Sequence, residues 1–191
     1  DFGTSVYDAV DLVLKDKLSK IGGRKAIVLF SDGVDTSSER ASDLSNKSNA
    51  IESDALIYVV QYDTFAEVQA LKNKPIIPQT TQIPGKDKNP FPIPQVGLPS
   101  DKGTSREEYQ KADEYLNELA LRTGGEVFKA NDIVSISKSF AKVAAELREF
   151  YSIGFSPKEE SKDGKKRKLK VKVNRENVAV KARDSYTAKK K

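Results

Sequence analysis

The sequence predicts a mixed α/β domain with a mainly parallel sheet flanked by helices, followed by a smaller antiparallel β appendage. Two continuous apolar runs, KAIVLF (25–30) and ALIYVVQY (55–62), are typical of strands that are buried on both faces. A polar helical segment separates them, so we expect a right-handed βαβ unit with parallel strands. Towards the C-terminus the pattern changes to short segments of alternating polarity, which favour antiparallel strands.

Helices are predicted wherever apolar residues recur every three or four positions. The expected helices cover about 4–20, 39–53, 106–122 and 133–151, and a short strand, EVFKA, lies between the last two. The expected apolar faces are Tyr109, Ala112, Leu116, Leu119 and Ala120 on the third helix, and Ile133, Ile136, Phe140, Val143, Ala144, Leu147 and Tyr151 on the fourth. The glycine pair after Thr123 is expected to end the third helix, because glycine is favoured just beyond a last helical turn.

A proline-rich segment interrupts this order. Seven of the eight prolines lie between Pro75 and Pro99, and proline disfavours both helix interiors and central strands. We therefore interpret about 74–105 as an insertion into a domain that spans 1–151. The insertion is either a surface loop or an arm that contacts a partner.

Residues 152–191 are expected to form a basic β extension. FYSIGFSP, RKLKVKVN and VAVKARDSYTA predict an antiparallel meander, and the alternation of Leu169, Val171 and Val173 with lysines predicts one buried face. From Lys158 onward there are fourteen Lys and Arg against five Asp and Glu, whereas the whole chain carries +5. The lysines form either a solvated sheet face or a surface for anionic ligands. No nucleic-acid-binding pattern accompanies them, so no nucleic acid partner is expected.

Composition restricts the chemistry. The chain contains no cysteine and no histidine, which excludes the usual zinc sites and imidazole-based catalysis within it. A metal would have to be held by oxygen, which favours Mg²⁺, Ca²⁺ or Mn²⁺. No paired-acid signature for catalysis is recognisable, so we do not expect an enzyme. No apolar run approaches the roughly 20 residues of a membrane-spanning helix.

The best candidate site follows the first apolar strand, in SDGVDTSS (31–38). Asp32 is either a turn residue that accepts backbone N–H groups or a metal ligand. Thr4 precedes the first helix, where it is either the N-cap or a hydroxyl ligand.

These segments carry a family resemblance. GTSVYDAV, followed some twenty residues later by GRKAIVLFSDGVDTSS, resembles the middle of a von Willebrand factor A (VWA) domain. LREFYSIGFSP, DGKKRKLKVKV and VAVKARDSYTA resemble the C-terminal end of the VWA-related proteins typical of Acidobacteria. The resemblance implies a three-layer, Rossmann-like fold whose site lies at the C-terminal ends of the strands, as is usual for open α/β sheets.

The resemblance also implies site residues. Thr4 and Asp32 would be metal ligands of the adhesion site of that family, which is a metal-ion-dependent (MIDAS) site, and Ser31, Gly33 and Asp35 would shape the adjoining loop. The family's first loop, D-x-S-x-S, supplies three of its five protein ligands and does not occur in this sequence. We therefore expect the chain to be N-terminally incomplete.

Two functions follow as expectations. The first is an adhesion module in which Mg²⁺, or Ca²⁺ or Mn²⁺, bridges to a carboxylate of a protein partner. The second is a metal-free structural subunit that self-assembles in an extracellular or cell-envelope structure. The resemblance implies a secreted or envelope protein in either case.

Overall fold

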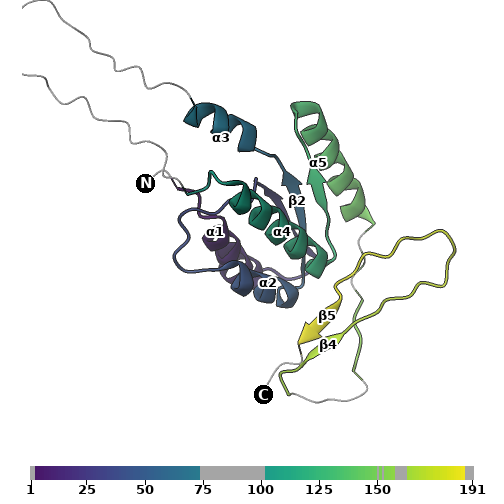
Figure 1. Cartoon of the computed structure of the whole chain (residues 1–191). Coiled ribbons are helices and arrows are strands. Elements are labelled where there is room, and N and C mark those ends of the chain that lie inside the picture. The colour runs from purple at the N-terminus through teal and green to yellow at the C-terminus, as the bar shows by residue number, and fades with distance from the viewer. Residues whose placement is uncertain (1–2, 74–101, 150, 152, 158–162, 188–191) are drawn as a thin grey trace, which may run out of the picture.

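The computed structural model describes residues 3–73, 102–149, 151, 153–157 and 163–187 (Figure 1). The helices are α1 (Val6–Leu12), α2 (Asp43–Glu52), α3 (Phe65–Lys72), α4 (Arg106–Thr123) and α5 (Ile133–Arg148), and a π-helical turn η1 (Val13–Lys17) and a 3₁₀ turn η2 (Leu18–Lys20) continue α1. The strands are β1 (Lys25–Phe30), β2 (Ala55–Gln61), β3 (Val127–Lys129), β4 (Lys166–Lys168) and β5 (Ser185–Thr187).

The strands form two separate sheets. β1, β2 and β3 lie side by side in that order and are parallel, with Ile27 opposite Ile57 and Val59 opposite Val127. β4 and β5 pair antiparallel, with Arg167 opposite Tyr186. These pairings confirm the prediction of a mixed α/β fold with a parallel sheet and an antiparallel C-terminal appendage.

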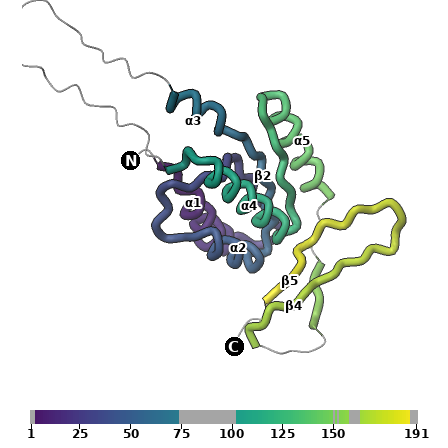
Figure 2. Tube along the Cα trace, in the orientation of Figure 1, coloured from purple at the N-terminus to yellow at the C-terminus, as the bar shows by residue number. Residues whose placement is uncertain are grey.

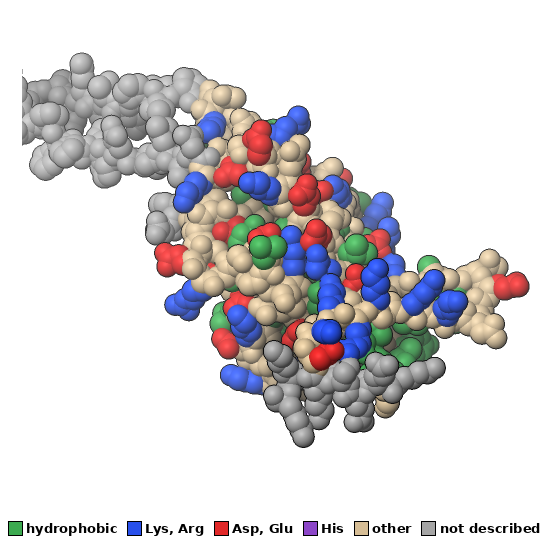
Figure 3. Space-filling view, turned by 60° about the horizontal axis from the view of Figure 1, so that its bottom comes forward, with side chains coloured by type: hydrophobic (Ala, Val, Ile, Leu, Met, Phe, Trp, Pro, Cys, Tyr) green, Lys and Arg blue, Asp and Glu red, His purple; other side chains and the backbone are tan. Residues whose placement is uncertain are grey.

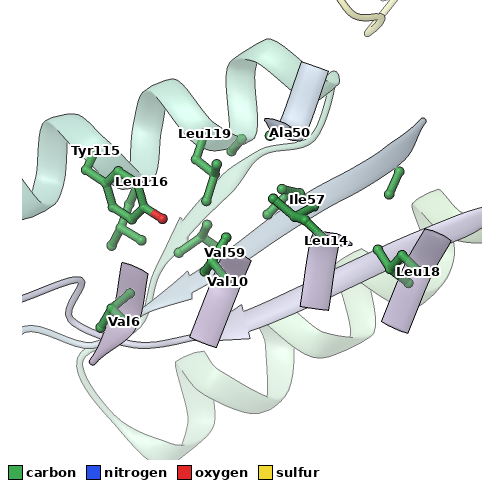
Figure 4. Packing of buried hydrophobic residues seen from close by; sticks show 12 residues of the cluster. Val6, Val10, Leu14, Leu18, Ala50, Ile57, Val59, Tyr115, Leu116 and Leu119 are labelled. Carbon is green, nitrogen blue, oxygen red and sulfur yellow. The ribbon is translucent and has the colours of Figure 1, made fainter. Parts of the chain in front are cut away.

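Helices cover the two faces of the parallel sheet. On one face α1, α2 and α4 pack against β2, and Figure 4 shows their side chains meeting those of the strand. The buried residues of this cluster are Val6, Val10, Leu14, Leu18, Ala50, Ala55, Ile57, Val59, Tyr115, Leu116, Leu119 and Ala120. On the other face a smaller cluster joins Tyr58, Phe128 and Val143 under α5. Because β2 alternates its side chains between the two faces, it contributes to both clusters.

The first strand departs from its prediction. We expected β1 to be buried on both faces, but Val28 is 39% exposed and Phe30 is 52% exposed. β1 is an edge strand, and α5 packs against β2 and β3, so the outer part of that face is uncovered. The expectation of full burial is therefore wrong for β1 and right for β2, most of whose residues are buried.

The third predicted helix is confirmed as α4, and its first and last residues lie close to the predicted positions. Ser105 and Glu108 form a capping box at the start of α4, and Glu108 also accepts the N–H of Gly103 at 2.9 Å. These bonds, the one from Gly103 foremost, lower the pKa of Glu108 to about 2. Gly124 ends the helix in the left-handed conformation, with φ of 84°. Of the predicted apolar face, all but the half-buried Tyr109 are buried.

Other helices differ at their ends or faces. α2 begins at Asp43, four residues later than predicted, because Ser42 and Ser45 form its capping box. α5 ends at Arg148 and buries Ser139 beside Val143, leaving Ile133 and Phe140 of the predicted face exposed. α3 was not predicted.

The C-terminal appendage is smaller than predicted. The meander of three strands is wrong for the described residues, which form two strands of three residues each. Val171 and Val173 are exposed, so the predicted buried face does not form there. The segment between β4 and β5 projects from the sheet (Figure 2), and lysines and arginines are frequent along it (Figure 3).

Ion pairs account for the course of the third predicted segment. Lys181 contacts Glu126 and Glu146, the latter at 2.7 Å, and Arg183 lies 3.4 Å from Asp54. The chain before β5 is thus held against the parallel domain instead of pairing as a long strand.

Two further expectations concern the proline-rich insertion and membrane-spanning helices. The proline-rich insertion lies almost wholly outside the described residues, which resume at 102. Among the residues that are described, no helix is both long and apolar enough to cross a membrane.

Gly125 provides a test of the packing between α4 and β2. A Cβ atom built at Gly125 would lie 1.9 Å from the backbone oxygen of Ile57, whereas one at Gly22 would meet nothing within 4 Å. We expect Gly125→Ala to lower the free energy of unfolding by about 3 kcal/mol, the upper range for overpacking. Urea denaturation measures this, with Gly22→Ala as the control. Equal midpoints for the two variants would contradict the close approach.

Candidate functional site

The candidate site lies where β1 ends and the chain turns towards α2. The N–H of Ser31 donates to the backbone oxygen of Val60, so pairing with β2 continues one residue beyond β1. Asp32 follows, and the chain from 31 to 41, called the SDG loop here, runs along the carboxyl end of the sheet. This is the edge at which ligands usually bind in open α/β sheets.

The SDG loop is bonded to the segment before α1. The N–H groups of Thr36 and Ser37 donate to the backbone oxygen of Thr4 at 2.8 and 3.2 Å. In return, the N–H of Thr4 donates to Oγ1 of Thr36 at 2.8 Å, and the hydroxyls of Ser5 and Ser37 are 2.9 Å apart. A Cβ atom at Gly3 would lie 2.5 Å from Oγ of Ser37. Two segments about thirty residues apart in sequence are therefore in close contact.

Asp35 and Ser38 satisfy the first turn of α1. Oδ2 of Asp35 accepts the N–H of Tyr7 at 2.9 Å, and Oγ of Ser38 accepts the N–H of Asp8 at 3.0 Å. Asp35 also accepts both the N–H and the hydroxyl of Ser38. Because the first N–H groups of a helix have no partner within it, the SDG loop acts as an external cap for α1.

Asp8 makes the reciprocal contact. Its carboxylate accepts the N–H groups of Glu39, Arg40 and Ala41 at 3.0, 3.0 and 2.7 Å. These bonds, the one from Glu39 foremost, lower the pKa of Asp8. The charge of Asp8 therefore holds the far end of the SDG loop.

Asp32 is bonded to two elements. Its Oδ1 accepts the N–H of Val34 at 3.1 Å, and its Oδ2 accepts the hydroxyl of Thr64 at 2.6 Å. The Thr64 hydroxyl is also 2.7 Å from that of Tyr109 on α4, and burial raises the pKa of Tyr109. The ring of Phe65 packs edge-on against Tyr109 at 5.1 Å between centroids. A chain of three polar groups thus links the SDG loop to α3 and α4.

Ser31 and Gly33 determine the turn at the start of the loop. Oγ of Ser31 accepts the N–H of Gly33 at 2.9 Å. Gly33 has φ of 82°, and a Cβ atom there would lie 2.6 Å from Cδ1 of Leu116. Glycine is therefore required at this position for both its conformation and its lack of a side chain.

Thr4 lies one residue before the N-cap of α1. The N-cap position of α1 is occupied by Ser5, so the interpretation of Thr4 as the N-cap is wrong. Thr4 is exposed, and its backbone contacts Thr36: its N–H donates to Oγ1 of Thr36 at 2.8 Å, and the Thr36 hydroxyl donates to the backbone oxygen of Thr4 at 3.5 Å.

The residues present make only part of a cation site. Mg²⁺ takes six oxygens in near-octahedral geometry, of which Thr4 and Asp32 would provide two. Asp8 and Asp35 are occupied by backbone N–H groups. Within the described ranges, no group of three or more acidic side chains is arranged to hold a metal. The described residues alone therefore do not fit a complete cation site.

Sequence reasoning missed Asp8, Thr64 and Tyr109. A signal for Thr64 was present, because it follows the second apolar strand, and parallel strands bring their carboxyl ends to one edge. Asp8 lies in the first turn of a helix, where acidic residues are common for local reasons, so its contact with a distant loop had no distinct signature.

Thr64 is expected to stabilise the site through its two hydroxyl contacts. Thr64→Val keeps the shape but leaves Oδ2 of Asp32 without this donor, so we expect a loss of about 1–3 kcal/mol in the free energy of unfolding. Thr64→Ser keeps the hydroxyl and is the matched control in chemical denaturation. No loss in Thr64→Val, which keeps the γ-methyl group and removes only the hydroxyl, would contradict the role of the hydrogen bonds.

Asp8 gives a prediction about pH. Its folded pKa lies below the ordinary value of 3.8, so its contribution to stability is complete above that value and is lost as pH falls through the folded pKa. We expect Asp8→Asn to be less stable than the parent chain at pH 7, with the difference shrinking below about pH 4. Thermal unfolding from pH 2.5 to 7 measures this, with the exposed Asp16→Asn as control. A difference that is independent of pH would contradict the role of the charge.

Comparisons with known proteins add no identity. No protein-family model matches the chain, no curated protein matches its sequence, and no solved structure matches its fold. The functional conclusion therefore depends on the residues and contacts of this chain, namely the SDG loop, its bonds to Thr4 and Asp8, and the link from Asp32 to Tyr109.

Proposed function

We propose that the chain is a protein-binding module with the three-layer arrangement of a VWA domain, and that it contacts its partner with the SDG loop and Thr4. One observation carries this proposal. The loop at the carboxyl end of the parallel sheet is held to the N-terminal segment by backbone bonds at Thr4 and by the carboxylate of Asp8. A loop fixed on a rigid scaffold is a favourable place for recognition.

The fixed geometry also favours affinity. A flexible loop loses conformational entropy when it binds, whereas a loop that is already ordered loses less. Asp35 and Ser38 order the SDG loop against α1, and Asp32 ties it to Thr64. Hence a partner would meet a surface that needs little rearrangement.

In the cation-dependent form of this proposal, Thr4 and Asp32 supply two oxygens to Mg²⁺, Ca²⁺ or Mn²⁺. The remaining ligands come from water and from a carboxylate of the partner. The exposure of Thr4, its backbone bonds to the SDG loop and the position of Asp32 near the start of that loop support this form.

A second candidate is a metal-free structural subunit, and a specific observation favours it. The acidic side chains of the site already accept hydrogen bonds from protein donors: Asp8 from three N–H groups, Asp35 from Tyr7, and Asp32 from Thr64. The loop therefore has its shape without any contribution from a cation. For either candidate we propose binding and not catalysis, and a secreted or cell-envelope location.

Calorimetry distinguishes the two candidates. If the cation-dependent form is right, we expect binding heat with Mg²⁺, Ca²⁺ or Mn²⁺. The affinity for the cation should fall at least tenfold in Asp32→Ala and in Thr4→Ala, because each variant removes one of few oxygen ligands. Asp16→Ala removes an exposed carboxylate elsewhere and should leave the heat unchanged. No heat with any of the three cations, or equal heat in Asp32→Ala, would contradict the cation-dependent form.

A further inference from the structure

The segment that joins β4 to β5 leaves the domain and returns to it as two arms (Figure 2), and residues 169–184 are called the ribbon here. At its base the N–H of Leu169 donates to the backbone oxygen of Asp184 at 2.7 Å. Among the described residues no further backbone hydrogen bond joins the two arms. Asn177 has φ of 58° in the turn between them. Every residue from 170 to 182 is exposed, so both arms meet solvent.

The ribbon exposes apolar side chains on both arms. The first arm alternates valine with lysine, and successive side chains of an extended chain point to opposite sides. The second arm alternates valine with alanine before it reaches Lys181. The four valines are between 39% and 50% exposed, and they are Val171, Val173, Val178 and Val180. The ribbon therefore presents apolar surface that the rest of the described chain leaves uncovered.

Positive charge is concentrated beside these valines. The stretch KKRKLKVKVNR (165–175) has seven Lys or Arg among eleven residues and no Asp or Glu. Arg167 is paired with Asp163 at 3.0 Å. Within the described ranges, none of the lysines at 166, 168, 170 and 172 makes an ion pair. Their charges lie close together without carboxylates to neutralise them, which favours an anionic partner.

We propose that the ribbon binds an anionic lipid surface, with its lysines at the headgroup phosphates and its valines at the boundary with the acyl chains. Charge complementarity selects a negative partner, and the valines select among negative partners. A water-soluble polyanion would match the lysines but would leave the valines in water. A lipid interface takes up apolar side chains and attracts basic ones. The long stem of a lysine lets its ammonium group reach the headgroups while a neighbouring valine lies deeper.

The base of the ribbon is fixed at the end of the domain that lies opposite the SDG loop. Lys181 contacts Glu126, and Arg183 lies 3.4 Å from Asp54. Glu126 and Asp54 directly precede β3 and β2, so both contacts are at the amino edge of the parallel sheet. The SDG loop lies at the carboxyl edge. The inference goes beyond the proposed function, because lipid binding at the ribbon needs neither a cation nor a partner at the SDG loop.

Co-sedimentation with lipid vesicles tests the role of charge. We expect the chain to bind vesicles of phosphatidylglycerol and phosphatidylcholine at least tenfold more tightly than vesicles of phosphatidylcholine alone, because each basic residue near an anionic surface contributes roughly fivefold. Reversing two charges in Lys170→Glu/Lys172→Glu should weaken binding at least tenfold for the same reason.

The matched control makes the same charge change elsewhere. Lys111→Glu/Lys138→Glu alters exposed positions of α4 and α5 and should bind like the parent chain at about 0.1 M salt, which screens distant charges. Circular dichroism establishes that each variant is folded. Equal binding to the two kinds of vesicle, or an equal loss in the two double variants, would overturn the proposal.

A second pair of variants tests the role of the valines. Val171→Ser/Val173→Ser keeps every charge and removes apolar surface from the interface, so we expect vesicle binding to weaken about fivefold. Leu44→Ser/Val134→Ser makes a similar change at exposed positions of α2 and α5 and should leave binding unchanged. If the valine variant binds like the parent chain, the ribbon recognises charge alone, as it would on an acidic polysaccharide, and the lipid proposal is wrong.

Fluorescence reports directly on contact with the lipid. The chain has no tryptophan, so Val173→Trp places a single indole on the ribbon. We expect its emission to shift to shorter wavelength with the anionic vesicles and not with phosphatidylcholine vesicles. Leu44→Trp is the control and should show no shift with either. An unshifted Val173→Trp spectrum on vesicles that bind the chain would show that this side of the ribbon stays in water, contrary to the proposal.

Discussion

The central strand β2 must be covered on both faces, and this constraint determines where most other elements lie. Its side chains are apolar on each side of the sheet, with Ile57 and Val59 facing one helical layer and Tyr58 facing the other. Water would contact whichever face stayed open, at a cost of roughly 25 cal/mol per Å² of apolar surface. α1, α2 and α4 satisfy one face and α5 the other. β1 and β3 then pair with the two edges of β2, so that all three strands end at the same edge of the sheet.

The SDG loop takes its shape from this arrangement and from a small number of charges. Once α1 packs beside the sheet, the N–H groups of its first turn and the polar groups after β1 lie close together. Buried or partly buried N–H groups need acceptors, and Asp8 and Asp35 supply them across the contact. These two carboxylates therefore have a structural role in holding the loop against α1. Any role in binding would be added to that structural role.

The sequence predicted the elements whose signals are local and missed those that depend on neighbours. Local signals were sufficient to predict β2 and α4, because each acts within one turn or one strand. These signals are the apolar run of β2, the capping residues of α4 and the glycine after that helix. The burial of β1 was predicted wrongly because the same apolar run occurs in a central strand and in an edge strand with an uncovered face. The alternating lysines after β4 were misleading as well, since alternation predicts a strand only where something covers the apolar side.

The candidate site was predictable to a similar extent. Asp32 could be identified because it directly follows an apolar run that predicts a strand, whereas Gly33 was singled out only through the family resemblance. Thr64 and Tyr109 reach Asp32 through the packing of α3 and α4, which no spacing in the sequence specifies. Contacts of this kind arise from the tertiary fold, so their discovery requires the structure.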